Sequence, residues 1–303
     1  MNTEKLYNEF KPLLFSLSYN ILGSVSDAED MVHEAFLSLE KIPEEDIRNV
    51  KSYMCKIVTH RSIDLLKSAS KQRETYMGPW LPEPLLTDSN LHGDLNPLEN
   101  YLLKESLSTA YILLLQHFSE TERVVFLLRE VFQYSYHDIA GIVNKSSTNC
   151  RQIYHRTKKA IGDLPKVDVS RKAETYAMSE KFANALMTGK MDQLLDVLKS
   201  EAVLYTDGGG KVQAALRPIH GSDKIIRYFN AIFPKVPKGF TCVLYEINGQ
   251  TGILIKIGDI TFTVVTFQFK GDHVSDVYIV MNPEKLTHFN NGREINIYEN
   301  EQK

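Results

Sequence analysis

The chain has 303 residues, with 43% hydrophobic and 24% charged side chains, 16 glycines, 11 prolines and a formal net charge of −3. This composition excludes disordered, collagen-like and fibrous proteins and allows two hydrophobic cores. The apolar runs are far shorter than the roughly 20 residues that span a bilayer, and the N-terminus lacks an apolar export segment, so we expect a cytoplasmic protein. The cysteines, Cys55, Cys150 and Cys242, are too scattered for a disulfide framework or a zinc site, so free thiols and no metal are expected.

The first two predicted elements are helices. Apolar residues recur at helical spacing from Leu6 to Ile21, and Gly23 is expected to end the first helix. The stretch from Ser26 to Glu29 has the capping-box pattern, which predicts that a second helix begins there and ends near Glu40. The residues expected on its inner side are Met31, Ala35, Leu37 and Leu39.

Charge is strongly segregated in this part of the chain. Residues 27–46 contain eight acids and one lysine, whereas residues 48–73 contain seven bases and one acid. The basic stretch lies on a third predicted helix, from about Asn49 to Ser70, whose packing side holds Met54 and Val58. Such a helix suits a phosphate backbone, although surface helices are often basic. Its polar stripe consists of Lys56, His60, Asp64, Lys67 and Lys71.

A proline-rich acidic segment follows in residues 74–103. It contains five acids and no lysine or arginine. Its four prolines, Pro79, Pro82, Pro84 and Pro97, exclude one continuous helix. A plain linker is one interpretation of this segment.

The strongest local signal lies between Ser119 and Ile161. Residues 119–122 and 135–138 each have the pattern of a helix N-terminus, and a polar turn at 144–146 precedes a last helix. This arrangement predicts a helix-turn-helix, whose last helix would enter the major groove of DNA; a solvated basic hairpin is the alternative. The residues expected to pack inward are Cys150, Tyr154, Thr157 and Ile161. The residues expected to face outward, with groups suited to base edges or phosphates, are Thr148, Asn149, Arg151, Gln152, His155, Arg156 and Lys159.

Glycine becomes frequent from residue 189 onward, which indicates a turn-rich C-terminal part that contains strands. Four strands are predicted from stretches rich in β-branched residues at 241–247, 251–257, 260–270 and 273–281. Helices are predicted at 174–199 and 222–233, and Asn282-Pro283 predicts the start of a short terminal helix. The expected fold is two all-α parts followed by an α+β domain with a curved antiparallel sheet and helices on one face.

Six segments resemble one protein family. LGSVSDAEDMVHEAF at 22–36 and SYMCKIVTHRSID at 52–64 resemble region 2 of bacterial extracytoplasmic-function sigma factors, and residues 119–164 resemble their region 4. WLPEP at 80–84, DGGGK at 207–211 and NPEKL at 282–286 resemble the subgroup with a SnoaL-like C-terminal extension of the NTF2 fold. His60 stands where Asn is usual in the family and Tyr53 where Trp is frequent, a difference that concerns the promoter sequence.

The resemblance implies a multidomain chain with two partners, core RNA polymerase and promoter DNA. Polymerase would be bound at its β′ coiled coil and its β flap, and the acidic linker would thread the cationic RNA path. The implied domains are region 2 at 1–73, the linker at 74–103, region 4 at 104–165, a SnoaL-like regulatory domain at 170–290 and a tail at 291–303.

The resemblance also implies roles for individual residues. Region 4 would bind the minus-35 element as duplex through the outward residues of its last helix. The residues implied in binding the minus-10 element as single strand are Lys56, His60, Arg61, Asp64 and Lys67. Those implied in binding polymerase are Asp27, Glu29, Asp30 and Glu34. Those implied in a contact between the linker and the C-terminal domain are Trp80, Pro82, Pro84, Asp207, Gly208, Gly209, Gly210, Lys211, Asn282, Pro283, Lys285 and Leu286.

Two other functions stay open on the sequence. One is a helix-turn-helix regulator that binds duplex DNA without polymerase. The other is a SnoaL-like enzyme with a DNA-binding appendage, which would use Asp or His in a cone-shaped pocket. The candidates for catalysis, which form no recognisable pair, are Asp207, His220, Asp223, His273 and Asp276. We therefore expect no catalysis, no cofactor and no membrane contact, and leave open a small ligand in the C-terminal pocket.

Overall fold

The computed structural model of the chain describes residues 3–43, 47, 49–73, 76–87, 108–162 and 171–290. The chain divides into two compact units. Unit 1 comprises Met1–Glu74 and Ser89–Pro165, and unit 2 comprises Thr75–Asp88 and Lys166–Lys303. The first part of the predicted linker therefore belongs with the C-terminal domain, and residues 88–103 of that linker and the predicted tail at 291–303 lie outside the described residues. Within the described part of the chain, no helix has the length and apolar character to span a membrane.

Unit 1 begins with three helices, α1 (Thr3–Leu22), α2 (Val25–Leu39) and α3 (Val50–Arg73). Gly23 ends α1 as predicted, with φ at 71° and its N–H donating to the Tyr19 carbonyl at 2.7 Å. The predicted N-cap at Ser26 is wrong, because Ser24 has the extended backbone of a cap and its hydroxyl accepts from the Asp27 N–H. The predicted burial of Leu37 is also wrong, since its side chain is 50% exposed.

The second half of unit 1 consists of α5 (Thr109–Leu115), α6 (Glu120–Glu130), α7 (Tyr136–Val143) and α8 (Ser147–Ile161). Ser119 and Glu122 form the predicted capping box of α6, and the Ser135 hydroxyl accepts from the Asp138 N–H to cap α7. Asn144 adopts the left-handed conformation, with φ at 54°, and turns the chain between α7 and α8. The predicted helix-turn-helix is thus confirmed as a structure.

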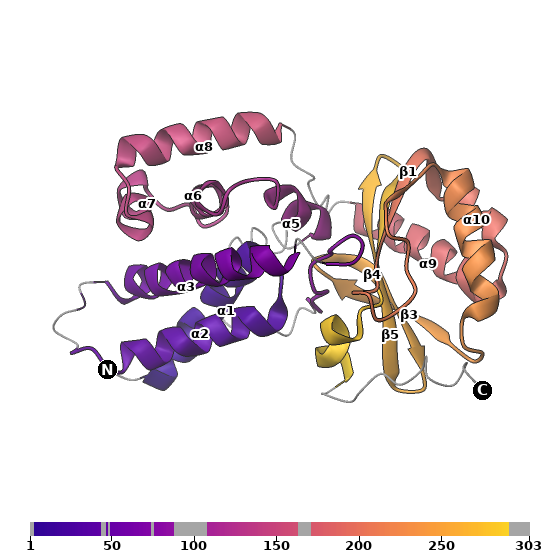
Figure 1. Cartoon of the computed structure of the whole chain (residues 1–303), viewed down its shortest axis with the longest axis horizontal. Helices are drawn as coiled ribbons and strands as arrows, with labels where there is room; N and C mark the ends of the chain where they lie inside the picture. The colour runs from indigo at the N-terminus through magenta and orange to yellow at the C-terminus, as the bar shows by residue number, and fades with distance from the viewer. Residues whose placement is uncertain are drawn as a thin grey trace. The chain divides into compact units, whose positions relative to one another are not determined.

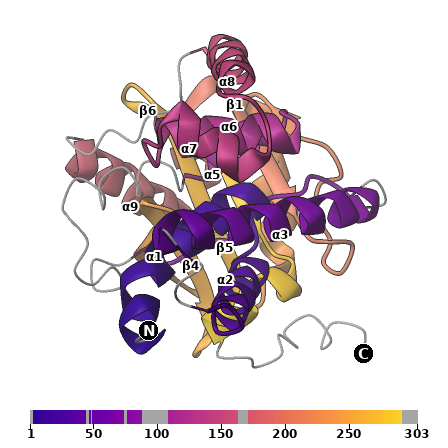
Figure 2. The same cartoon turned by 90° about the vertical axis from the view of Figure 1, so that its left-hand side faces the viewer.

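The helices of unit 1 share one hydrophobic core. It includes Leu17 of α1, Met54 of α3 and Phe126 of α6, all fully buried. Figures 1 and 2 show α3 alongside α1 and α2, and α3 also packs against α6 and α7. Arg123 of α6 is 4% exposed and donates to the carbonyls of Leu115 and Ile21, so a buried guanidinium satisfies the C-terminal end of α1.

Unit 2 is built on a six-stranded sheet with the order β2-β1-β6-β5-β4-β3. The strands are β1 (Leu198–Asp207), β2 (Ile219–His220), β3 (Thr241–Ile247), β4 (Gln250–Ile257), β5 (Ile260–Lys270) and β6 (His273–Val280). The four predicted strands, β3 to β6, pair antiparallel as expected, but the expected antiparallel sheet misses β1, which pairs with β6 in parallel. The predicted helix at 174–199 is also wrong beyond Thr188, since Gly189 takes the left-handed conformation, and β1 begins at Leu198.

Two helices cover one side of this sheet. They are α9 (Lys172–Thr188), which packs on β3 and β4, and α10 (Ser222–Ile232), which packs on β1. Two short 3-10 turns, η3 (Met191–Asp196) and η4 (Phe233–Lys235), follow them, and the yellow η5 (Pro283–Asn290) lies on the other side of the sheet in Figure 1. The predicted start of η5 is confirmed, because the Asn282 side chain accepts from the Glu284 N–H. The α+β class is therefore correct.

Candidate nucleic-acid interface and linker site

The outward face of α8 gathers the residues predicted to bind duplex DNA. All seven, Thr148, Asn149, Arg151, Gln152, His155, Arg156 and Lys159, are exposed. The four residues predicted to pack inward, Cys150, Tyr154, Thr157 and Ile161, are buried. The Arg151 guanidinium lies 5.2 Å from the centre of the Tyr136 ring, and this cation–π contact holds it against α7.

A cavity of about 320 Å³ lies between the N-terminus of α6 and α8. On its wall, Arg156 donates to Glu122 at 2.6 Å while its own side chain stays 70% exposed. The hydrogen bond from the Ser119 hydroxyl, followed by Arg156, holds the pKa of Glu122 below its usual value. The carboxylate is thus ionised and orients a guanidinium at the edge of the outward face of α8. The other lining residues are Thr121, Lys145, Asn149, Gln152 and Ile153.

The residues predicted to bind the single strand on α3 have different environments. Asp64 and Lys67 are exposed, whereas Lys56 and His60 are half-buried. The Nε2 atom of His60 lies 2.6 Å from the Ile142 carbonyl oxygen in α7, which joins the two helical parts of unit 1. Nothing is described of the side chain of Lys71.

The acidic helix α2 presents Glu29 and Asp30 to solvent and leaves Asp27 and Glu34 half-buried. Glu34 forms an ion pair with Arg61 of α3, and Arg61 also donates to the Ser38 hydroxyl. The structure thereby brings together two residues that the resemblance assigned to different partners.

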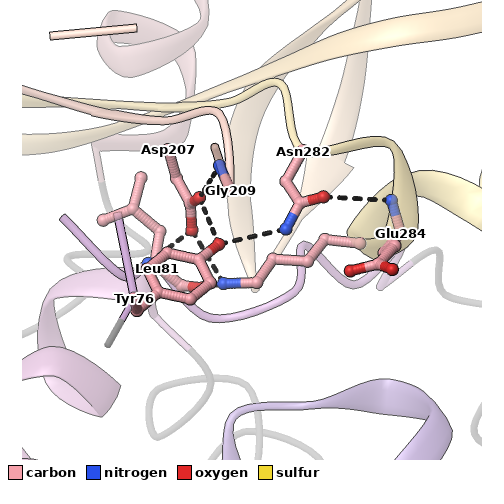
Figure 3. Close-up of polar contacts among 7 residues, drawn as sticks. Tyr76, Leu81, Asp207, Gly209, Asn282 and Glu284 are labelled. Carbon is pink, nitrogen blue, oxygen red and sulfur yellow. Dashed lines mark hydrogen bonds and ion pairs between the residues drawn. The ribbon is translucent and has the colours of Figure 1, made fainter. Parts of the chain in front are cut away.

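Asp207 is the centre of the linker site in unit 2. Its side chain is fully buried and accepts four hydrogen bonds, which Figure 3 shows in part. The donors are the Tyr76 hydroxyl at 2.5 Å, the Leu81 N–H at 2.8 Å, the Gly209 N–H at 3.0 Å and the Lys285 ammonium at 2.7 Å. Two of these four donors come from the linker segment, defined as residues 76–87.

Lys285 completes this site from η5. Its side chain is 8% exposed, and besides Asp207 it donates to the Leu81 carbonyl. The ammonium lies 4.1 Å from the Trp80 ring centre and 5.1 Å from the Tyr76 ring centre. A buried ammonium with a carboxylate, a carbonyl and two aromatic faces around it is well compensated for lost hydration.

Three consecutive glycines shape the turn after Asp207. A Cβ on Gly208 would stand 2.2 Å from the Val212 carbonyl oxygen, and one on Gly209 would stand 2.3 Å from the Asn282 amide nitrogen. Gly209 and Gly210 also have φ values of 60° and 73°, which disfavour other residues. The turn therefore needs glycine for close approach and for backbone conformation.

The rest of the linker segment packs along the end of β3. Leu86 forms a β-bridge with Ile247, and the Asn248 side chain accepts from the Leu85 N–H at 3.1 Å. Pro82 and Pro84 are buried, and His288 donates to the Pro84 carbonyl at 2.7 Å. Lys211 forms an ion pair with Glu284, and Leu286 is fully buried.

Analysis of the sequence alone did not identify several residues of these sites. Tyr76 and His288 lie outside the three motifs that their side chains contact. Leu81 lies within the WLPEP motif, but it takes part through its backbone N–H and carbonyl, so its residue type gave no signal. Arg123 was missed because one arginine in an amphipathic helix is most often exposed. The described residues contain no cluster of three or more potential metal ligands, and the three cysteines are free.

Comparisons with known proteins agree with this architecture. The Sigma-70 region 2 family model matches residues 6–72, and the Sigma-70 region 4 model matches residues 108–161. The ECF RNA polymerase sigma factor SigJ of Mycobacterium tuberculosis is 28% identical over 251 residues, which cover 81% of this chain and 79% of SigJ. A probable ECF RNA polymerase sigma factor of the same species, SigI, is 24% identical over 281 residues, which cover 90% of this chain and 91% of SigI.

A solved structure matches the fold of the chain, including its C-terminal domain. The crystal structure of M. tuberculosis SigJ matches with a TM-score of 0.70 at 23% identity, over 93% of this chain and 98% of SigJ. The two sigma family models, the curated relatives and the shared two-part fold agree with the motifs in the sequence. The chain therefore contains Sigma-70 regions 2 and 4, is homologous to extracytoplasmic-function RNA polymerase sigma factors, and shares with SigJ a fold that includes the C-terminal domain.

Proposed function

We propose that α8 of this sigma factor binds the minus-35 element of its promoters as duplex DNA. The supporting observation is the exposed row of seven polar and basic side chains on a helix that follows a helix-turn. Arg and Gln side chains suit the base edges of the major groove, and Lys159 suits phosphate.

In the same proposal, α3 holds the opened strand of the minus-10 element. Arg61, Asp64 and Lys67 are exposed on it. His60 and Cys55 instead contact the second half of unit 1, His60 through Ile142 and Cys55 through the Tyr134 hydroxyl at 3.1 Å. Binding of a strand by His60 therefore requires that α3 and α7 separate, and we propose that core polymerase stabilises this opened form.

The polymerase contact is proposed for α2. Its acids would face the β′ coiled coil, since opposite charge favours association, and region 4 would contact the β flap. Leu37 adds an apolar anchor to this surface, because it is half exposed three residues after Glu34. The protein would act in the cytoplasm, together with polymerase and the chromosome.

The C-terminal domain is proposed to modulate transcription through the linker segment. Residues 76–87 connect the two sigma regions in sequence, and Asp207, Lys285 and Asn282 fix them on the C-terminal domain. A linker with its first part held in this way has less freedom to separate the two regions. Loss of the site would thus change promoter output rather than only stability.

Catalysis is not part of the proposal. No carboxylate or imidazole occurs among the described residues that line the large cavity of the C-terminal domain. Asp207 is occupied by four hydrogen bonds, and Asp276, whose pKa burial raises, does not line the cavity. The geometry therefore favours a regulatory role over the enzyme alternative.

The test is a binding assay against core polymerase followed by runoff transcription. The intact chain is expected to bind core and to start transcription at a specific promoter, and Arg151→Ala with Gln152→Ala is expected to reduce initiation without reducing core binding. Lys181→Ala, on the exposed side of α9, is the matched control. Specific duplex binding by the chain alone, with no association with core, would instead support the regulator alternative.

A further inference from the structure

The C-terminal domain contains a second site, a cavity of about 460 Å³ between the sheet and α10 with η4. The sheet supplies Ile255, Val265 and Ile279, and the helical side supplies Phe233 and Val236. A cavity of this size with mostly apolar walls fits a small organic molecule. None of these residues takes part in the linker site.

The charged residues described on the wall of this cavity are all basic. Two of the lining residues are the exposed lysines Lys211 and Lys235, and no described lining residue is acidic. An apolar interior with two ammonium groups on its wall favours a molecule that has an apolar body and an anionic group.

One of these lysines already has an anionic partner. Lys211 forms an ion pair with Glu284, and the two side chains are 48% and 68% exposed. Such an exposed pair contributes little stability, so a carboxylate in the cavity can replace Glu284 at low cost. A carboxylate bound beside Lys211 would therefore compete with Glu284, which does not itself line the cavity.

The wall of this cavity also contacts the residues of the linker site. Met281 lines the cavity, and its N–H donates to the Asp207 carbonyl at 2.8 Å. The Glu284 N–H donates to the Asn282 side-chain oxygen, and the Asn282 side-chain NH₂ group donates to the Tyr76 hydroxyl at 3.0 Å. Occupancy of the cavity thus acts on residues adjacent to those that hold the linker segment.

We propose that this cavity binds a small molecule with an apolar body and a carboxylate, and that the carboxylate competes with Glu284 for Lys211. This binding is independent of the proposed promoter contacts, so it can be measured on the full chain without polymerase or DNA.

The experiment is isothermal titration calorimetry of the intact protein with decanoate as the probe, below its micelle concentration. Decanol and decylamine keep the chain length and change the head group. Decanoate is expected to bind at one saturable site about tenfold more tightly than decanol, because a charge-assisted hydrogen bond is lost with the alcohol, and decylamine is expected not to bind.

Variants with opposite expected effects sharpen the test. Lys211→Met with Lys235→Met is expected to weaken decanoate about tenfold and to leave decanol within about twofold. Glu284→Gln removes the competitor and is expected to strengthen decanoate about two- to fivefold. Val236→Phe places a larger side chain on the cavity wall and is expected to weaken the binding of both decanoate and decanol. Lys224→Met and Glu180→Gln, which change the same charges away from the cavity, are the controls.

Three results would overturn the proposal. One is the absence of saturable decanoate binding by the folded protein. Another is equal binding of decanoate, decanol and decylamine. The third is a Glu284→Gln protein that binds decanoate no more tightly than Glu180→Gln, which would exclude the competition.

Discussion

Glu34 of α2 and Arg61 of α3 form an ion pair, with 45% and 43% of their side chains exposed. Each was assigned a separate partner by resemblance, polymerase for the acid and DNA for the base. Because the two side chains touch, a charge change at either one alters the other, and single variants at these positions report on both surfaces together.

The first prediction concerns the polymerase surface. Glu29→Lys with Asp30→Lys, on exposed positions of α2, is expected to weaken association with core polymerase at low salt, because opposite charges no longer face each other. The weakening is expected to shrink as added salt screens these charges. Titration of labelled protein with core at two salt concentrations measures this, and Glu180→Lys on α9 is the control. A core affinity that is unchanged at both concentrations would assign the surface elsewhere.

The second prediction concerns α8. Arg151→Ala or Gln152→Ala is expected to cost about 1–3 kcal/mol of promoter binding by holoenzyme where the side chain binds a base. Arg156→Ala also leaves the Glu122 carboxylate beside DNA, so its effect is expected to exceed that of Glu122→Gln, which frees Arg156 but keeps its charge. Competition binding with promoters altered in the minus-35 element measures both effects. Unchanged affinity and sequence preference in all three alanine variants would contradict the assignment.

The third prediction concerns the buried ion pair of the linker site. Lys285→Met leaves the Asp207 carboxylate buried without its cation and is expected to destabilise the domain by about 3–5 kcal/mol. Adding Asp207→Asn to Lys285→Met removes the unpaired charge and is expected to recover part of this loss. Urea unfolding gives the free energies. Trp80, the only tryptophan, gives an independent fluorescence readout, because its ring faces the Lys285 ammonium.

A matched substitution tests the glycine turn. Gly209→Ala is expected to destabilise the linker site, because its Cβ would meet the Asn282 side chain at 2.3 Å and φ is positive. Gly209→Ala combined with Asn282→Ala is expected to cost less than the sum of the two single variants, since the clash disappears. Gly271→Ala also has positive φ but meets nothing within 4 Å, so it isolates the cost of the backbone conformation. Equal destabilisation by Gly209→Ala and Gly271→Ala would show that the approach to Asn282 is unimportant.

The fifth prediction uses Cys55 to follow the separation of the two halves of unit 1. Burial raises the pKa of this thiol, which contacts Tyr134, so little reactive thiolate is expected near neutral pH and alkylation of the free protein is expected to be slow. Binding to core is expected to accelerate alkylation. Because the pKa is higher in the folded state, this thiol stabilises the fold below its ordinary pKa and loses that contribution as the pH rises above it.

A protein with Cys150→Ala and Cys242→Ala, which retains only Cys55, allows this measurement by mass spectrometry. The control is core polymerase that is already bound to an unrelated sigma factor, because it shows whether polymerase itself changes the activity of the alkylating reagent. An alkylation rate that is the same with and without core would mean that the contact between Cys55 and Tyr134 persists in the complex.

The helices of unit 1 were predictable because their signals are local. Capping residues and helical spacing define α6, α7 and α8 within a few residues each, and the outward face of α8 follows from its period. The start of α2 was misplaced because Ser24 and Ser26 are equally good caps, and the turn at Gly23 decides between them.

The sheet was harder to predict because the pairing of β1 with β6 is not local. β1 carries polar residues at Lys199, Ser200 and Glu201 and follows a helix, so its sequence gave no strand signal, and its parallel pairing with β6 joins segments about 70 residues apart. In the linker site, Trp80 and the prolines were evident in the sequence. The roles of Tyr76 and the Leu81 backbone depend on distances that only the folded chain sets.

The order of synthesis gives the linker site a further consequence. A ribosome makes residues 76–87 early and η5 roughly 200 residues later, which at bacterial elongation rates takes about 10 to 40 s. Both helical parts of unit 1 are complete well before Lys285 emerges. During that interval Leu81, which is 1% exposed in the finished protein, lacks its partners, and the nascent chain is a sigma factor whose linker is not yet restrained. Each new molecule thus passes through a stage in which the linker segment is not yet held, before β6 and η5 complete the site.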